Sequence, residues 1–196
     1  MLKKLARKDL YSLEQYAEAR PTFRAEVLAH KRRRQLAIGP NATLFFEDRL
    51  TVQYQIQEML RVERIFERSG IEEELESYNP LIPDGSNLKA TMMIEFEDAN
   101  VRQAALARLR GVERQIWLRV GAGDTTYAIA DEDLERENDT KTSAVHFLRF
   151  ELNEADRSAL LNGAPLAMGS NHDAYQHTVD PVDSIFRDAL TADLAA

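Results

Sequence analysis

The polar side chains whose types and spacing could do chemistry lie between positions 47 and 64. Glu58 precedes Arg61 by three residues and Gln57 precedes it by four, so on a helix their side chains share one neighbourhood. A carboxylate just before such a helix faces the positive end of its dipole. Carboxylate, amide and guanidinium groups together can fix a ligand or the polar groups of a partner. The candidate site therefore comprises Glu47, Gln55, Gln57, Glu58, Arg61 and Arg64.

This segment has several readings. In the first, the cluster binds a partner or a small anionic ligand. In the second, Glu47, Glu58 and Glu63 are metal ligands or a general base of a small enzyme, and carboxylates without cysteine suit Mg, Mn or Fe better than zinc. In the third, the side chains form solvated pairs that each stabilise the helix only slightly. The polar helix could also form the seam of a homodimer.

The histidines give weaker signals. His146 alternates in phase with Leu148 and Phe150, so a hydrogen-bonded core histidine is favoured over a ligand. His172 and His177 are five residues apart, which suits neither the i,i+4 pairing of a helix nor the same face of a strand. A metal site at this pair is therefore the less favoured reading, and the sequence indicates no particular cofactor.

Composition excludes several classes of chemistry. The chain has no cysteine, so it forms no disulfide, thiol nucleophile, cysteine zinc site or thiolate-held cluster. Its net charge of −8 argues against nucleic-acid binding, which depends on neutralising phosphates. There is no Gly-rich phosphate loop, no apolar run long enough to span a membrane and no secretory signal. We therefore expect a cytoplasmic protein that binds neither nucleic acid nor membrane.

The elements that position these residues can be read from periodicity and caps. Ser12 begins a capping box, and Pro21 suits the first turn of a second helix over 22–35. A short strand at 42–47 leads into the polar helix, which is expected over 49–68. Gly70 should interrupt the chain before a short acidic helix that ends at Asn79 and Pro80. Further helices are expected after the caps Asp98 and Asn153, and at the C-terminus.

The second half of the chain alternates apolar and polar residues with the period of strands, at 88–97, 116–120, 125–130, 143–152 and 165–170. A charged loop is expected over 131–142. The predicted elements begin with helices and continue with strands joined by short helices and hairpins. This order favours an α+β fold with a largely antiparallel sheet. We expect a single compact domain with a helical layer at about 9–79, a sheet-rich part at about 80–180 and a C-terminal helix at about 181–194.

Four segments carry a resemblance to a known family: LYSLEQYAEARPTFRAEVLAHKRRRQLAIG, LFFEDRLTVQYQIQEMLRVERIFE, ELESYNPLIP and LKATMMIEFED. Together they resemble the bacterial family catalogued as domain of unknown function 3501, over nearly the whole chain. The resemblance names no catalytic residue. It implies a link to redox or peroxide metabolism, because genes of this family neighbour those of rubrerythrin-like and iron–sulfur oxidoreductases. We therefore expect an accessory or binding protein of such an oxidoreductase, with any cluster held by the partner.

Overall fold

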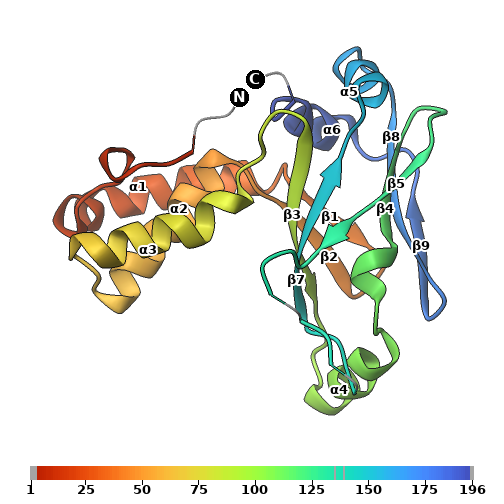
Figure 1. Ribbon diagram of the computed structural model, residues 1–196, viewed down its shortest axis with the longest axis horizontal. Coiled ribbons are helices and arrows are strands. Elements are labelled where there is room, and N and C mark those ends of the chain that lie inside the picture. The colour runs from red at the N-terminus through yellow and green to blue at the C-terminus, as the bar shows by residue number, and fades with distance from the viewer. Residues whose placement is uncertain (1–3, 135, 139, 195–196) are drawn as a thin grey trace.

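The computed structural model of the chain describes residues 4–134, 136–138 and 140–194. It contains two antiparallel sheets with a layer of three helices beside them (Figure 1). Every strand pair in these residues is antiparallel. The predicted α+β class is thus confirmed. The helical layer projects from one side of the sheets, as Figure 1 shows.

The first helix of the layer, α1 (Leu13–Lys31), begins at the predicted capping box of Ser12. The predicted division at Pro21 is wrong, because α1 runs through this residue without a break. Tyr16, Phe23 and Val27 lie buried along one side of the continuous helix. Burial of three large side chains offsets the single backbone hydrogen bond that a proline removes.

The polar helix, α2 (Arg49–Glu63), is shorter than predicted and is followed by α3 (Arg68–Tyr78). The chain turns at Arg64, which has a φ of 57° and donates its backbone N–H to the carbonyl of Leu60. Gly70 lies inside α3 and does not interrupt it. The helix α2 packs on both neighbours: Leu50 and Tyr54 pack against the buried side chains of α1, and Ile56 and other residues pack against Leu75 of α3.

The five-stranded sheet has the order β1 (Gln35–Ile38), β2 (Ala42–Phe46), β3 (Asn87–Ile94), β7 (Val145–Glu151) and β6 (Ile129–Ala130). The strand β1 was not predicted, because its residues follow a helix directly and carry no clear alternation. The turn to β2 uses Gly39 at a φ of 71°, a conformation that glycine adopts without strain. Two strands from the N-terminal part of the chain thus enter this sheet.

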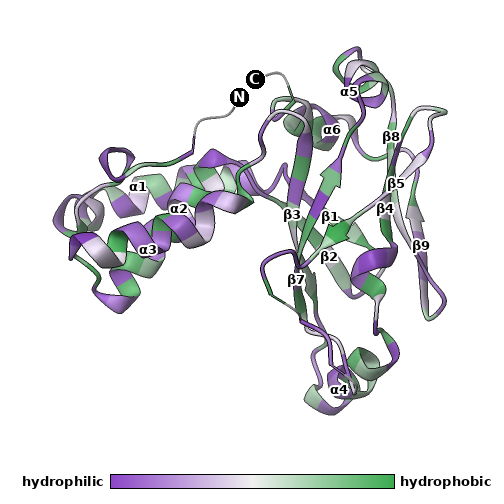
Figure 2. Cartoon of the chain, viewed as in Figure 1, coloured by the Kyte–Doolittle hydropathy of each residue, from purple (hydrophilic) through white to green (hydrophobic). Residues whose placement is uncertain are grey.

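The four-stranded sheet has the order β5 (Thr125–Tyr127), β4 (Ile116–Val120), β8 (Leu166–His172) and β9 (Tyr175–Val179). The predicted hairpin is correct for β4 and β5, whereas β6 leaves it to pair with β7. The strand β9 was not predicted. The main core is formed by inward side chains of both sheets together with side chains of the short helices that cover them. Figure 2 shows hydrophobic residues among hydrophilic ones along β3 and β7.

Shorter helices surround the sheets: α4 (Ala99–Arg108), α5 (Glu154–Leu161), α6 (Ser184–Thr191), η1 (Arg7–Asp9), η2 (Asn79–Leu81) and η3 (Val112–Gln115). The predicted caps Asp98 and Asn153 accept backbone hydrogen bonds at the starts of α4 and α5. In the described part of the chain, no helix has the length and apolar character needed to cross a membrane.

The buried side chain of Arg34 joins the helical layer to the C-terminal part of the chain. Its guanidinium donates to the carbonyl oxygens of Phe46 over 3.1 Å, Glu47 over 3.2 Å and Ala189 over 2.7 Å, and it pairs with Asp193. Burial raises the pKa of Asp193 to about 6, and the charge of Arg34 opposes this rise. One arginine therefore ties the start of α2 to the region of α6.

Candidate functional site

Glu47, between β2 and α2, is buried and already bonded. The hydroxyl of Thr51 donates to its carboxylate over 2.6 Å, and that of Thr91 on β3 donates over 2.9 Å. The carboxylate thus links the start of α2 to the sheet. It faces the interior, where these two hydroxyl groups occupy it.

Gln57 is also buried, and its amide holds the segment before α1. Its Oε1 accepts from the backbone N–H of Tyr11 over 2.6 Å, and its Nε2 donates to the Tyr11 carbonyl over 3.4 Å. One turn earlier, Gln53 Nε2 donates to the carbonyl of Asp9 over 2.7 Å. The two amides thus bond backbone groups at the end of η1 and in the short connection from η1 to α1.

Glu58 connects α2 to α1. Its carboxylate accepts from Tyr16 Oη over 2.7 Å and from Arg20 Nε and Nη2 over 2.7 and 2.9 Å. Arg61 contributes a weaker contact over 3.3 Å. The hydrogen bonds from Arg20, followed by those from Tyr16 and Arg61, lower the pKa of Glu58 to about 2 in spite of partial burial. Burial and the hydrogen bond to Glu58 raise the pKa of Tyr16.

Gln55 lies on a different side of α2, toward α3. Its side chain is hydrogen-bonded to Tyr78, whose pKa is raised by burial and lowered in part by this hydrogen bond. Tyr78 in turn lines a cleft beside the sheets. Gln55 is therefore the member of the predicted site that supports a residue of this cleft.

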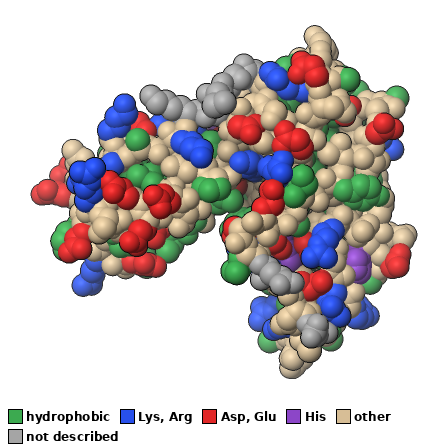
Figure 3. Space-filling view, viewed as in Figure 1, with side chains coloured by type: hydrophobic (Ala, Val, Ile, Leu, Met, Phe, Trp, Pro, Cys, Tyr) green, Lys and Arg blue, Asp and Glu red, His purple; other side chains and the backbone are tan. Residues whose placement is uncertain are grey.

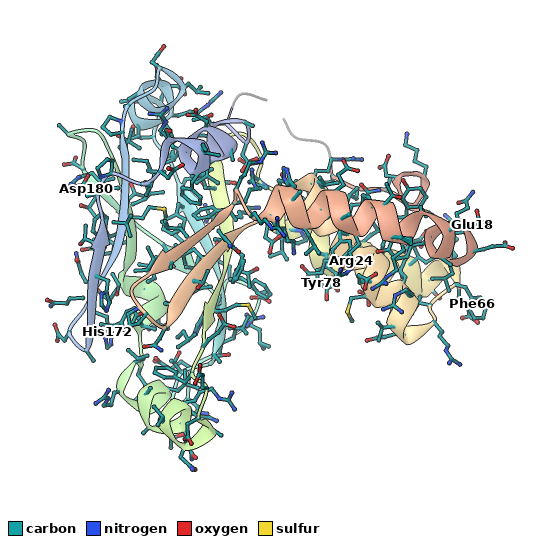
Figure 4. All side chains as sticks on the ribbon, turned by 180° about the vertical axis from the view of Figure 1, so that it is seen from behind. Glu18, Arg24, Phe66, Tyr78, His172 and Asp180 are labelled. Atoms are coloured by element: carbon teal, nitrogen blue, oxygen red, sulfur yellow. The ribbon has the colours of Figure 1, made fainter. Side chains whose placement is uncertain are left out.

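Arg61 and Arg64 remain exposed at the far end of α2, together with two apolar side chains. Phe66 is 71% exposed and Val62 is 63% exposed. We call Arg61, Val62, Arg64 and Phe66 the helix-end surface. Figure 4 shows Phe66 at the end of the helical layer farthest from the sheets. Beside it lies a small pocket of about 170 Å³ with mostly apolar walls that include Leu10, Leu60 and Ile71.

The six predicted site residues therefore do not converge on one pocket. Glu47 lies just before α2, Glu58 lies about 14 Å of helix rise beyond the first residue of α2, and Glu63 lies at its end. Among the residues that the structure describes, no group of three or more His, Asp or Glu side chains could hold a metal ion. The geometry does not favour the reading of Glu47, Glu58 and Glu63 as metal ligands.

The predicted hydrogen-bonded core histidine, His146, is confirmed. It is fully buried; its Nδ1 lies 2.6 Å from Asp131 and its Nε2 lies 3.0 Å from Thr142 Oγ1 and from the Ser143 carbonyl. This hydroxyl–imidazole–carboxylate order resembles that of a hydrolase triad. Thr142 is only 1% exposed, however, so a substrate could not reach its hydroxyl. The cluster fixes the two ends of the charged loop to β7.

His172 and His177 are not part of a comparable buried hydrogen-bonded cluster. His172 Nε2 is 3.0 Å from the carbonyl of Arg110, and the ring of His177 packs edge-on against Tyr175 with 4.5 Å between centroids. Both rings thus have structural neighbours. The geometry gives the less favoured metal reading of this pair no support.

The structure contains a cleft of about 640 Å³ that was not predicted from the sequence. One wall is formed by the end of α3 and by η2, and the other wall is the outer face of β3 and β7. Lys89 and Arg149 stand directly opposite each other on these strands. In Figure 3, basic, acidic and hydrophobic side chains meet where the helical layer joins the sheets, and the surface is hollowed there. The polar positions of the two alternating strands were a signal, but only the strand register brings them together.

The fold and these sites define a cysteine-free α+β protein with a projecting helical layer and a cleft beside its larger sheet. The chain belongs to the family described as "Protein of unknown function (DUF3501)", whose model matches residues 4–194. The chain is similar to a protein of unknown function from Burkholderia pseudomallei K96243 whose crystal structure is solved. The two are 50% identical over 98% of this chain and 100% of that one, with a TM-score of 0.94. No curated protein matches the chain.

Proposed function

We propose that this protein is a cytoplasmic accessory or binding protein of a redox- or peroxide-related oxidoreductase, and that it docks its partner with the helix-end surface. The carrying observation is the exposure of Phe66 and Val62, at 71% and 63%, in the same stretch of chain as the exposed Arg61 and Arg64, with Phe66 at the end of a projecting layer. Aromatic residues, including Phe, and arginine are enriched at protein–protein interfaces relative to the rest of the surface.

The remaining contacts of α2 support this choice of surface. Gln57 and Glu58 hold the backbone of the preceding segment and the side chains of α1, so they shape the layer from within. The side chains of α2 that remain exposed for a partner are those at its end. There Phe66 can enter an apolar pocket of the partner, while Arg61 and Arg64 meet carboxylates around that pocket.

The nature of the partner rests on the family resemblance, whose neighbouring genes imply rubrerythrin-like and iron–sulfur oxidoreductases. Because the chain has no cysteine, a thiolate-held cluster in such a system would belong to the partner. The role proposed for this chain is recognition and positioning.

The test is an affinity pull-down of the tagged protein from its native cells, read by mass spectrometry. Wild type is compared with Phe66→Ser, with Arg64→Gly and with Ile185→Ser, a matched control because Ile185 is 61% exposed on α6, outside the helix-end surface. We expect wild type and the control to capture an oxidoreductase, and both helix-end variants to lose most of it.

Two results would count against the proposal. Equal capture of the oxidoreductase by all four proteins would exclude the helix-end surface as the docking site. Capture of proteins without a redox function, or of a second copy of this chain alone, would exclude the oxidoreductase partner. In the latter case, light scattering against protein concentration would establish the homodimer.

A further inference from the structure

The cleft beside the five-stranded sheet has the size and the lining of a small-molecule site. Its volume of about 640 Å³ lies within the range of ligand pockets, about 300–1,000 Å³. Tyr78, Leu81 and Ile82 line it on the side of the helical layer, and Phe147 on β7 lines it on the side of the sheet. An apolar or aromatic molecule could pack between these two walls.

Lys89 is the polar group best placed in the cleft. Its Nζ donates to the carbonyl oxygens of Pro80 over 2.6 Å and of Ile82 over 3.1 Å. An ammonium group has three hydrogens, and the described residues supply no acceptor for the third. The side chain is half-buried, and burial lowers its pKa. Lys89 is thus a fixed, partly desolvated donor with one free position.

The carboxylates of the cleft are already occupied. Asp84 accepts from the Ser86 hydroxyl over 2.8 Å, and Asp133 forms a double contact with Arg136 over 2.6 and 2.8 Å. Glu132 accepts from Arg149 Nε and Nη2 over 2.8 and 2.9 Å. The hydrogen bonds from Arg149 lower the pKa of Glu132, so this carboxylate stays charged near neutral pH.

The unused hydrogen-bonding capacity in the cleft, rather than its net charge, therefore favours an anionic ligand. Each carboxylate has its own donor, whereas Lys89 keeps an unused hydrogen. Glu132 occupies Nε and Nη2 of Arg149 in the two-pronged geometry with which arginine recognises a carboxylate, and Glu151 pairs with its Nη1. Glu132 stands where a ligand's anionic head would compete with it for Arg149.

We propose that this cleft binds an organic anion with an apolar body, its head on Lys89 and its body between Tyr78 and Phe147, and that Glu132 restrains this binding by occupying Arg149. Two substitutions should then act in opposite directions. Lys89→Met keeps the aliphatic stem and removes the charge. Glu132→Gln weakens the hold on Arg149 and removes a negative charge beside the ligand's head.

The experiment is a fluorescence titration with anilinonaphthalene sulfonate, an aromatic body with an anionic head. Phenylnaphthylamine, which has the same body without the sulfonate, is the matched neutral probe. We expect Lys89→Met to weaken sulfonate binding about tenfold, the loss of one hydrogen bond to a charged group, and to leave the neutral probe unchanged. Glu132→Gln should strengthen sulfonate binding. Lys8→Met, at an exposed lysine outside the cleft, should change neither.

Competition identifies the class of head group. Octanoate should displace the sulfonate probe, and octylammonium should not. The proposal is overturned if Lys89→Met weakens both probes alike, since that would mean a disturbed cleft wall, or if it weakens neither. It is also overturned if Glu132→Gln weakens sulfonate binding, or if octylammonium displaces the probe as well as octanoate does.

Discussion

The carboxylate of Glu58 gives the sharpest test of how the helical layer is held together. It accepts hydrogen bonds from Tyr16 and Arg20 of α1, and its pKa is lowered from 4.5 to about 2. A shift of this size corresponds to about 3 kcal/mol if fully expressed. The side chains of Glu58 and Arg20 are 21% and 33% exposed, so solvent screening should reduce this to about 1–2 kcal/mol.

The pH at which this stabilisation disappears follows from the direction of the pKa change. The folded protein holds Glu58 ionised down to a lower pH than the unfolded chain does. The contribution is therefore fully present above pH 4.5 and is lost as the pH falls toward about 2. Glu58→Gln cannot titrate, so its stability should lack this component of the pH dependence.

The assay is urea unfolding of wild type and Glu58→Gln at pH 7 and near pH 3. The variant should be less stable by about 1–2 kcal/mol at pH 7, and the difference should shrink at the lower pH. Glu76→Gln, at an exposed position of α3, is the control and should match wild type at both. A difference between wild type and Glu58→Gln that is equal at the two pH values would refute the reasoning.

Three further substitutions test other parts of the structure. Arg64→Gly should stabilise the protein by about 1 kcal/mol, because glycine adopts a positive φ without strain; thermal unfolding measures this, and Arg64→Ala should bring no gain. Gln57→Ala should destabilise by about 1–3 kcal/mol by leaving backbone groups of Tyr11 unbonded; faster hydrogen exchange at Tyr11 would accompany it. The pKa of Asp193 is raised to about 6, so wild type should lose stability relative to Asp193→Asn as pH rises from about 4 to 6; urea unfolding across this range shows the trend or contradicts it.

The features of the fold that were predicted correctly are those determined over short distances along the chain. Ser12, Asp98 and Asn153 each bond a backbone N–H two or three residues ahead, so a short stretch of sequence suffices to identify the cap. The strands β1 and β9 were missed because their residues show no clear alternation of apolar and polar side chains, and their stability comes from pairing with neighbours. The break at Pro21 was wrongly predicted for the same reason: the residues that keep α1 continuous are buried against α2.

The candidate site was harder to predict, because the partners of its residues come from far away in the sequence. Spacing correctly indicated that Arg61 lies beside Glu58. It could not indicate that Arg20, 38 residues earlier, makes the stronger contact. The cleft depends on residues that are even farther apart in the sequence. Lys89 and Arg149 face each other on neighbouring strands, and η2 packs beside them.

The unusual polarity of α2 has a structural cause. This helix lies between α1 and α3, and it also holds the segment at Asp9–Tyr11, so it has neighbours on several sides. A layer of three helices has a small core, and much of the contact between its elements is made by polar groups bonded to one another. Glu58 and Gln57 serve these contacts. Binding is therefore to be sought where side chains are not used in this way, at Phe66 on the helix-end surface and at Lys89 in the cleft.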